Sequence, residues 1–302
     1  IAGKRRKAVH DINYFHEHEL KGHDFLGCCK DCRASLNIIK PHILAFVEKI
    51  RKYTRQMLED LPPDDLYRLY QLLDDLAHLG AGEQLAGLIL EEKEIQAVLP
   101  IIRTNYATFF SIHEAHLAER LIEAADPWET LQSFPLYPRY ETLIQIQMAA
   151  MSDCQFRKLA FVGCGSVPMS LILMARSHGT RSLGLDVSRD SVVSAQAVIR
   201  SLGLEDRIEI IQGDERLLRD LRWDAVLIAA LAEPKERIFR NLRRILAEQN
   251  RHVPIIYRTY TGMRAVLYEP VSTEDAKGFR IVKKIFPTGR VNNTTILAEL
   301  ED

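Results

Sequence analysis

The sequence predicts an α/β protein in which a helical region precedes a parallel, nucleotide-binding sheet. From Phe156 onward, short apolar strand candidates alternate with helix candidates, a pattern typical of βαβ units. A glycine-rich turn, Gly163–Pro168, follows the first of these strand candidates. Between Ala34 and about Met151, apolar residues recur at helical spacing without a strand pattern, which indicates a helical bundle.

The composition excludes several classes of function. The 302 residues contain 40 basic and 41 acidic side chains, giving a net charge of −1. Without excess basic charge we expect no nucleic-acid partner and no anionic membrane partner. The longest apolar runs, such as Ala225–Ala232, are too short to cross a bilayer. Five cysteines without a regular framework favour a reducing cytoplasm over secretion.

We expect three segments along the chain. They are a polar extension over residues 1–34, a helical bundle over 35–151 and a sheet domain over 152–302. The extension is rich in histidine and cysteine and includes His16, His18, His23, Cys28, Cys29 and Cys32. Its single Cys-x-x-Cys has the spacing of half a zinc site, whereas a structural site needs four ligands. Metal binding there stays open beside a disordered, frayed terminus, and we expect the protein to require no metal.

The helical bundle is divided by its prolines and glycines. The run Pro62–Asp65 ends one helix and begins another, and Gly80–Gly82 interrupts the pattern again. A long helix is predicted from about Pro100 to Ala124, and a further one from Pro138 to about Met151. No strand is expected before Phe156.

Seven strands are predicted in the sheet domain. They are Leu159–Val162, Ser182–Val187, Arg207–Ile211, Trp223–Ala229, His252–Tyr257, Phe279–Phe286 and Thr294–Leu300. Helices over 168–178, 189–202, 214–220 and 234–247 fit between the first five, which predicts parallel strands with right-handed crossovers. Only the turn around Pro287–Gly289 joins the last two, so we expect a hairpin at one edge.

The glycine-rich turn has the features of a ligand cradle. Gly163 and Gly165 permit a tight turn that brings backbone N–H groups close to a ligand, and the helix after Pro168 adds positive charge at its N-terminus. Asp186 ends the second strand, where a carboxylate binds a ribose diol, and Asp214 ends the third, where it can accept an adenine amino group. Both aspartates could instead cap helices.

These features fit a dinucleotide site or an S-adenosylmethionine site. Three of them favour the second: Pro168 in place of a third glycine, the acid after the third strand, and a terminal hairpin that completes seven strands. The domain therefore resembles the class I S-adenosylmethionine-dependent, Rossmann-like transferase fold, preceded by an all-helical domain.

Longer motifs resemble one family. They are Glu114 with the helix that follows it, PWETLQSF, YPRY, FVGCGSVP, ALAEPKERIFRNL, YRTYTGMRAVLYEPV and VNNTTIL, over about residues 95–300. The sequence resembles nicotianamine synthases, most closely the archaeal type. This resemblance implies transfer of the 3-amino-3-carboxypropyl group of S-adenosylmethionine to a small amine or amino acid. Methylthioadenosine would leave, and the product would be a nicotianamine-like metallophore.

The resemblance also implies roles for individual residues. Glu114 falls on the family's proton acceptor, and a glutamate among apolar neighbours has a raised pKa that suits this task. Tyr140, the last residue of YPRY, matches an active-site tyrosine. Candidates for binding the substrate and its carboxylates are Tyr137, Arg139, Arg258 and Arg264. Glu114 could instead pair with Arg120, and Tyr137 could simply pack in the core.

Two other functions remain open at this point. One is a small-molecule methyltransferase with the helices as a lid, which would release S-adenosylhomocysteine. The other is a ligand-binding protein without turnover. The starting amine, with glutamate, histidine or a further S-adenosylmethionine-derived unit as candidates, also stays open, as do the number of transfers and a homodimer.

Overall fold

A computed structural model describes residues 30–301 of the chain. The described chain falls into two compact units. The first holds the described residues up to Phe109 together with Tyr260–Pro270, and the second holds Phe110–Thr259 with the described residues from Val271 onward. Each unit is described by itself below.

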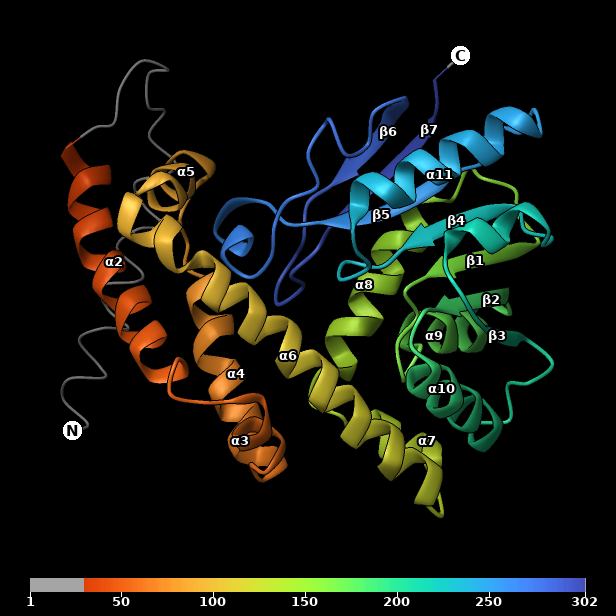
Figure 1. Cartoon of the computed structure of the whole chain (residues 1–302), viewed down its shortest axis with the longest axis horizontal. Coiled ribbons are helices and arrows are strands. Elements are labelled where there is room, and N and C mark those ends of the chain that lie inside the picture. Colours follow the sequence, from red (N-terminus) through yellow and green to blue (C-terminus); the bar gives the residue numbers. More distant parts are fainter. Residues whose placement is uncertain (1–29, 302) are drawn as a thin grey trace. The chain divides into compact units, whose positions relative to one another are not determined.

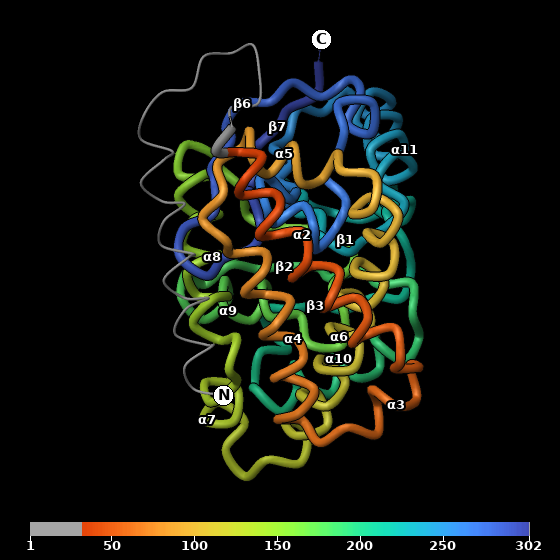
Figure 2. Tube along the Cα trace, turned by 90° about the vertical axis from the view of Figure 1, so that its left-hand side faces the viewer, coloured from red at the N-terminus to blue at the C-terminus, as the bar shows by residue number. Residues whose placement is uncertain are grey.

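The first unit is helical (Figure 1). Its helices are α2 (Lys30–Ile50), α3 (Arg55–Glu59), α4 (Pro63–Ala77), α5 (Glu83–Glu91) and the first part of α6 (Lys93–Glu123). Helix α2 contacts both α4 and α5, and Figure 2 shows it lying beside them. The core side chains share helical spacing and are almost fully buried: Ile39, Ile43, Leu66, Leu73, Ile89, Ile95 and Ile102. Burial of these stripes explains why the segments form helices rather than strands.

A segment from late in the sequence completes the first unit. Residues Tyr260–Pro270 contain the short 3₁₀ helix η2 (Gly262–Val266), which contacts α4 and α5. Arg103 fixes this segment: Nη2 donates to the carbonyl oxygen of Ala265 at 3.1 Å, and Nη1 lies 3.5 Å from Oε2 of Glu269. The unit is therefore built from two separate stretches of chain.

Helix α6 begins earlier than the sequence predicts. The expected start was Pro100, but the helix begins at Lys93 and Pro100 lies inside it. A proline within a helix removes one hydrogen bond and usually kinks or ends the helix. Here Ile95, Leu99 and Ile102 on both sides of the proline are buried, so packing of these side chains stabilises the helix across Pro100.

The second unit contains a single seven-stranded sheet (Figure 1). Its strands are β1 (Lys158–Val162), β2 (Arg181–Asp186), β3 (Ile208–Gln212), β4 (Ala225–Ile228), β5 (Ile255–Thr259), β6 (Phe279–Ile285) and β7 (Thr294–Leu300). They run in the order β3-β2-β1-β4-β5-β7-β6. The first five pair in parallel, whereas β7 is antiparallel to both β5 and β6. The predicted α/β class and the terminal hairpin are confirmed.

Helices cover both faces of this sheet. The helices that follow α6 in this unit are α7 (Pro127–Gln132), α8 (Tyr137–Ala150), α9 (Met169–His178), α10 (Arg189–Ser201), the 3₁₀ helix η1 (Glu215–Arg219) and α11 (Lys235–Glu248). Helix α11 packs on one face, where Phe239 and Leu242 join a core that includes Val162, Val226 and Tyr257. On the other face, α9 and α10 contact β2 and β3. Helix α8 contacts α9 and the strands β6 and β7. The predicted 214–220 helix is the shorter η1.

Both tryptophans of the chain lie in the second unit. Trp223 is 2% exposed, belongs to the sheet core and donates from Nε1 to the carbonyl oxygen of Leu218 at 2.7 Å. Trp128 in α7 lies under the guanidinium of Arg176, whose Cζ is 4.3 Å from the ring centroid. Helix α7 itself begins at Pro127 because Asp126 accepts a hydrogen bond from the backbone N–H of Glu129 at 2.9 Å.

The compact units do not follow the predicted domain limits. The predicted division between 151 and 152 lies in the turn between α8 and β1, whereas the compact units divide within α6, after Phe109. Residues 30–34 of the predicted extension already belong to α2, and the rest of the extension lies outside the described residues. Across residues 30–301, no helix has both the length and the apolar composition needed to cross a membrane.

Candidate functional site

The glycine-rich turn lies where the strand order of the sheet reverses. Strand β1 pairs with β2 on one side and β4 on the other, and Val162 at its carboxyl end lies opposite Leu185 and Ile228. The connections at this end of β1 therefore lead to opposite sides of the strand. In doubly wound sheets such a point forms a crevice in which ligands bind. The turn therefore occupies the expected position for a nucleotide cradle.

Gly163 begins the turn in a backbone conformation that suits glycine. Its φ is +78°, and its N–H donates to the carbonyl oxygen of Leu185 at 2.8 Å. A Cβ at this position would lie 2.7 Å from Cβ of Ala232, in the segment after β4. Pro168 ends the turn as the residue before α9, and its carbonyl oxygen accepts from Ile172. The turn is thus closed on one side by the post-β4 segment, which we define as residues 229–234.

Asp186 ties the turn to the end of β2. Its Oδ2 accepts a hydrogen bond from the N–H of Gly165 at 2.9 Å, and its Oδ1 accepts from the N–H of Ser188 at 3.0 Å. The predicted alternative of helix capping does not describe this residue, because Ser188 itself caps α10 through Ser191. Asp186 therefore holds the glycine turn and stands at the sheet edge, as a ribose-binding acid should.

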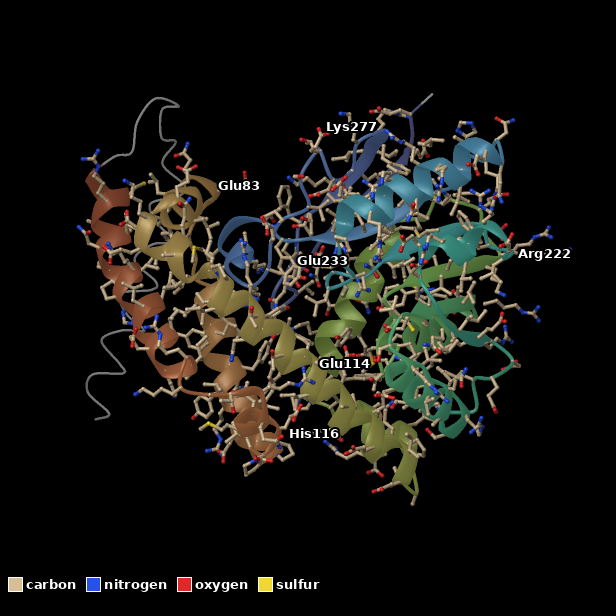
Figure 3. The ribbon with its side chains drawn as sticks, in the orientation of Figure 1. Glu83, Glu114, His116, Arg222, Glu233 and Lys277 are labelled. Atoms are coloured by element: carbon tan, nitrogen blue, oxygen red, sulfur yellow. The ribbon has the colours of Figure 1, made fainter. Side chains whose placement is uncertain are left out.

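Glu114 from α6 lies directly against the turn (Figure 3). A Cβ on Gly165, whose φ is +71°, would lie 2.5 Å from Oε2 of Glu114. Glycine at 165 is thus required twice, by the positive φ and by the close approach of a carboxylate. The sequence separates Glu114 and the turn by many residues, and the fold brings them together.

The surroundings of Glu114 strongly favour its protonated form. Burial is the main cause and the nearby charge of Asp186 the second, and together they raise the pKa of Glu114 to about 8. A hydrogen bond from the backbone of Ser166 and the charge of Arg258 act in the opposite direction. A carboxyl group with a pKa in this range can both accept and release a proton near neutral pH.

Asp214 is held by its own turn. It caps η1 by accepting from the backbone N–H of Arg216 at 3.0 Å, and the Arg216 guanidinium contacts both of its oxygens, with Nε at 2.9 Å from each. Hydrogen bonding to Arg216 lowers the pKa of Asp214. The helix-capping alternative for Asp214 is therefore what the structure shows, at the same sheet edge as Asp186.

Arg258 in β5 is buried between two helices. It is 6% exposed, and its Nη2 donates to Oε1 of Gln147 in α8 at 3.0 Å and to Oγ of Ser170 in α9 at 2.6 Å. Its Cζ lies 5.6 Å from the centroid of the Phe161 ring. The guanidinium thus joins β5, α8 and the first turn of α9, while its charge acts on Glu114.

The YPRY residues form the first turn of α8. Tyr137 is 6% exposed, and burial raises the pKa of its phenol, which fits the core-packing alternative. Arg139 and Tyr140 are half-buried. Tyr140 lies two helical turns before Gln147, on the helix that Arg258 contacts.

Two predicted features belong to the first unit or lie outside the described residues. Arg264 lies in η2 and belongs to the first unit. Most of the His/Cys segment, including Cys28 and Cys29, lies outside the described residues, and Cys32 lies in α2. Within residues 30–301, no group of three or more His, Cys, Asp or Glu side chains could hold a metal ion.

Several side chains around the turn were missed by sequence reasoning. Gln147 and Ser170 contact Arg258, while Glu215 and Lys235 are almost fully buried polar residues at the same sheet edge. Lys235 lies in the motif ALAEPKERIFRNL, which offered a signal. The other three stand in apolar helical patterns or beside Asp214 and have no motif of their own.

Comparison with known proteins assigns the chain to a family. The family model described as nicotianamine synthase protein matches residues 37–302, nearly the whole described chain. The chain belongs to the nicotianamine synthase family. This confirms the resemblance drawn from the longer motifs.

Individual nicotianamine synthases are similar over most of their length. Nicotianamine synthase 1 of Arabidopsis thaliana is 25% identical over 281 residues, covering 87% of this chain and 84% of that protein. The nicotianamine synthase of Solanum lycopersicum is 25% identical over 277 residues, covering 86% and 85%. The crystal structure of MtNAS in complex with MTA and tNA is 32% identical with a TM-score of 0.80, covering 91% of this chain and 100% of that one. A glutamine-for-glutamate mutant of MtNAS with S-adenosylmethionine has a TM-score of 0.79 at 32% identity and the same coverage.

Proposed function

We propose that the protein is an S-adenosylmethionine-dependent aminocarboxypropyltransferase that makes a nicotianamine-like product. Membership of the nicotianamine synthase family supports this function. The MtNAS complexes with S-adenosylmethionine and with MTA and tNA support the cofactor and the products. S-adenosylmethionine is then the substrate that donates the transferred group.

The position of Glu114 on the glycine turn is the observation that carries the proposal. Its Oε2 lies against Gly165, in the cradle that would hold the sulfonium compound, and its pKa is raised to about 8. The α-amino group of a free amino acid also has a pKa of about 8 or higher, so most of it is protonated near neutral pH. A carboxyl group matched to that pKa can take the proton from the ammonium without a large energetic cost.

The transfer step follows from this match. Glu114 accepts a proton from the substrate ammonium, and the freed nitrogen lone pair attacks the methionine γ-carbon next to the sulfonium. The new C–N bond forms as the C–S bond breaks, and the bonding electrons return to sulfur. Methylthioadenosine leaves as a neutral molecule. The step needs nitrogen, carbon and sulfur in line, which a site that orients both substrates supplies.

We assign the remaining site residues as follows. Tyr140 orients the amine near Glu114. Gly163, Gly165 and Pro168 shape the cofactor cradle, while Asp186 and Asp214 face the ribose and the base. Candidates for the substrate and its carboxylates are Tyr137, Arg139, Arg258 and Arg264. Since Nη2 of Arg258 already donates to Gln147 and Ser170, a substrate carboxylate would have to bind another edge of that guanidinium.

The decisive experiment is a product assay. The full chain is incubated with S-adenosylmethionine, with and without glutamate, and the products are identified by mass spectrometry. We expect methylthioadenosine, together with aminocarboxypropyl adducts whose masses identify the starting amine and the number of transfers. Release of S-adenosylhomocysteine instead would identify a methyltransferase and overturn the proposal.

Three further expectations rest on the same function. We propose a cytoplasmic enzyme, a product that acts as a metallophore, and domains over 35–151 and 152–302. The metallophore is tested by titrating the purified product with Ni²⁺, Fe²⁺ and Zn²⁺. The homodimer that the sequence left open is tested by sedimentation of the full chain.

A further inference from the structure

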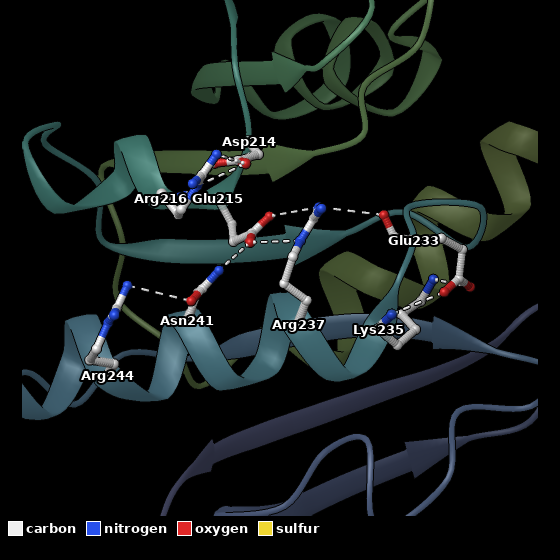
Figure 4. Close-up of polar contacts among 8 residues, drawn as sticks. All are labelled: Asp214, Glu215, Arg216, Glu233, Lys235, Arg237, Asn241 and Arg244. Carbon is white, nitrogen blue, oxygen red and sulfur yellow. Dashed lines mark hydrogen bonds and ion pairs between the residues drawn. The ribbon is translucent and has the colours of Figure 1, made fainter.

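The post-β4 segment is held from within by one buried lysine, whose contact with Glu233 is drawn in Figure 4. Lys235 opens α11 and is 5% exposed. Its Nζ folds back and donates to the carbonyl oxygen of Ala230 at 2.9 Å, to the carbonyl oxygen of Ala232, and to Oε1 of Glu233 at 3.2 Å. All three acceptors belong to the post-β4 segment, so the ammonium group fixes its shape.

The Glu233 carboxylate contacts both the backbone N–H and the side-chain ammonium of Lys235. Its Oε2 accepts from the backbone N–H of Lys235 at 2.9 Å, while its Oε1 contacts Nζ. Burial lowers the pKa of Lys235, and the charge of Glu233 opposes this change. A buried ammonium with three oxygen partners is a well-satisfied group, and removal of that group would leave two carbonyl oxygens without this donor.

The segment that Lys235 fixes lies directly against the glycine turn. The N–H of Ala229 donates to the carbonyl oxygen of Val162 at 3.0 Å. Cβ of Ala232 lies 2.7 Å, and Cβ of Ala229 3.4 Å, from the position that a Cβ on Gly163 would take. Because a Cβ atom moves with its backbone, a shift of Ala232 would change the space beside Gly163.

A second set of contacts holds Glu233 and connects it to the loop after β3. Nη2 of Arg237 lies 3.4 Å from the carbonyl oxygen of Glu233, and its Nε lies 3.3 Å from Oε1 of Glu215. Glu215 is fully buried and also accepts from Nδ2 of Asn241 at 2.6 Å. Glu215 directly follows Asp214, so the network joins the two loops after β3 and β4 to α11 (Figure 4).

We propose that Lys235 is a positioning residue for S-adenosylmethionine, because it holds the post-β4 segment against Gly163 and so sets one wall of the cradle. The proposal rests on the function proposed above. Lys235 has no part in proton transfer, since its ammonium group is enclosed by the segment's own oxygens. Its loss should weaken cofactor binding and leave the chemical step nearly unchanged.

The test compares Lys235→Met with Lys277→Met. Lys277 is 67% exposed and pairs with the nearby Glu274, so the same substitution there is a matched control. Isothermal titration should show the dissociation constant of Lys235→Met for S-adenosylmethionine raised by about tenfold or more, as expected on losing hydrogen bonds from a charged group. KM should rise in parallel, with kcat within about threefold of wild type, as for lost ground-state binding.

Hydrogen exchange separates this proposal from the proposed function. In the ligand-free protein, amides of Gly163–Pro168 and the post-β4 segment should exchange about tenfold faster in Lys235→Met than in wild type. This readout requires no turnover, whereas failure of the proposed function would appear as a wild-type protein without methylthioadenosine release. Unchanged exchange with unchanged affinity would overturn the role of Lys235, and so would a fall in kcat at constant KM.

A second variant covers a failure of Lys235→Met to fold. Glu233→Ala removes one of the three acceptors, and its side chain is 43% exposed, so the fold should tolerate it. We expect its affinity for S-adenosylmethionine to fall and its amide exchange to become faster, each by less than in Lys235→Met. A Glu233→Ala protein that matches wild type in both measurements would also count against the proposal.

Discussion

Two glutamates at the same edge of the sheet have opposite surroundings. Glu215 is fully buried, and its carboxylate contacts the Arg237 guanidinium and the amide of Asn241. Glu114 lies against Gly165, and after burial the strongest influence on its pKa is a second carboxylate, Asp186. The first acid is held in place by complementary partners, whereas burial and a second carboxylate raise the pKa of the second to about 8.

This difference separates a structural acid from a reactive one. An ion pair with additional hydrogen bonds fixes the geometry of a carboxylate, which suits a residue that joins two loops. A general base needs a pKa near the operating pH, and unfavourable neighbours are the usual way to raise a carboxyl pKa. In the sequence Glu114 stands between His113 and Ala115, and Glu215 stands between Asp214 and Arg216. These neighbours do not reveal the difference, which comes from the tertiary partners.

The largest expected effect is on catalysis through Glu114. Glu114→Gln keeps the shape of the side chain but cannot accept the ammonium proton, so kcat should fall by about 10²–10⁴-fold. The dissociation constant for S-adenosylmethionine should stay within about threefold of wild type, because the lost group acts in the chemical step. Rates of methylthioadenosine release and calorimetric titration provide the two measurements.

Glu83→Gln is the matched control for that substitution. Glu83 is an exposed residue in the first turn of α5, and its variant should retain wild-type turnover. Normal turnover in Glu114→Gln would show that Glu114 is not the proton acceptor. The distinction between a reactive Glu114 and a structural Glu215 would then be wrong.

The second effect concerns stability through Glu215. Glu215→Ala leaves Arg237 and Asn241 without their buried partner, and we expect the free energy of unfolding to fall by about 3 kcal/mol, at the low end for a broken buried pair because Arg237 is 37% exposed. Urea denaturation followed by circular dichroism measures this loss. Glu209→Ala, which breaks the exposed pair with Lys158, should cost at most about 1 kcal/mol. Equal losses in the two variants would show that Glu215 does not hold the loops.

The third effect tests the contact between Glu114 and the turn. Gly165→Ala places a Cβ where Oε2 of Glu114 lies, so the carboxylate must move, and we expect kcat to fall by about 10–100-fold through misplacement. Gly203→Ala is the control, because Gly203 has a φ of +65° but no atom within 4 Å of the new Cβ. Both variants should lose a similar 1–2 kcal/mol of stability, roughly the backbone cost of a left-handed residue. Retained activity in Gly165→Ala would show that the close approach is not needed.

The last expected effect is a pH dependence of stability. The pKa of Glu114 is raised from 4.5 to about 8, so between these pH values the folded state binds more protons than the unfolded state. Stability therefore falls as the pH rises through this window, and the loss is complete above about pH 8. Glu114→Gln lacks this term, so its Tm relative to wild type should increase between pH 5 and pH 8 by about 3 °C or more, at about 2–4 °C per kcal/mol. A difference that stays constant with pH would contradict the raised pKa, and Glu83→Gln provides the baseline.

The sequence predicted the centre of the sheet well because β1 and β4 are almost entirely apolar and buried. Thr294–Leu300 was predicted with the bounds it has, and the other strands differ by a few residues at their ends. Strands buried on both faces give this clear signal. The start of α6 was wrong, since Pro100 looked like a boundary and tertiary packing outweighs its local cost.

The site was predictable only in part. The glycine turn and Asp186 follow from local order along a strand, a turn and a helix, and both lie at the expected edge. The approach of Glu114 to Gly165 depends on how α6 packs, which no local pattern records. The partners of Arg258 likewise come from two helices distant in sequence, so its burial could not be read from the residues beside it.

The placement of the two tryptophans gives the molecule a selective optical signal. Trp223 in the sheet core and Trp128 beside Arg176 both belong to the second unit, and the sequence contains no other tryptophan. Intrinsic tryptophan emission therefore reports on the unit that carries the glycine turn and Glu114. The helical first unit contributes through tyrosine alone, so emission and far-ultraviolet dichroism together can reveal whether the two units unfold in one transition or two.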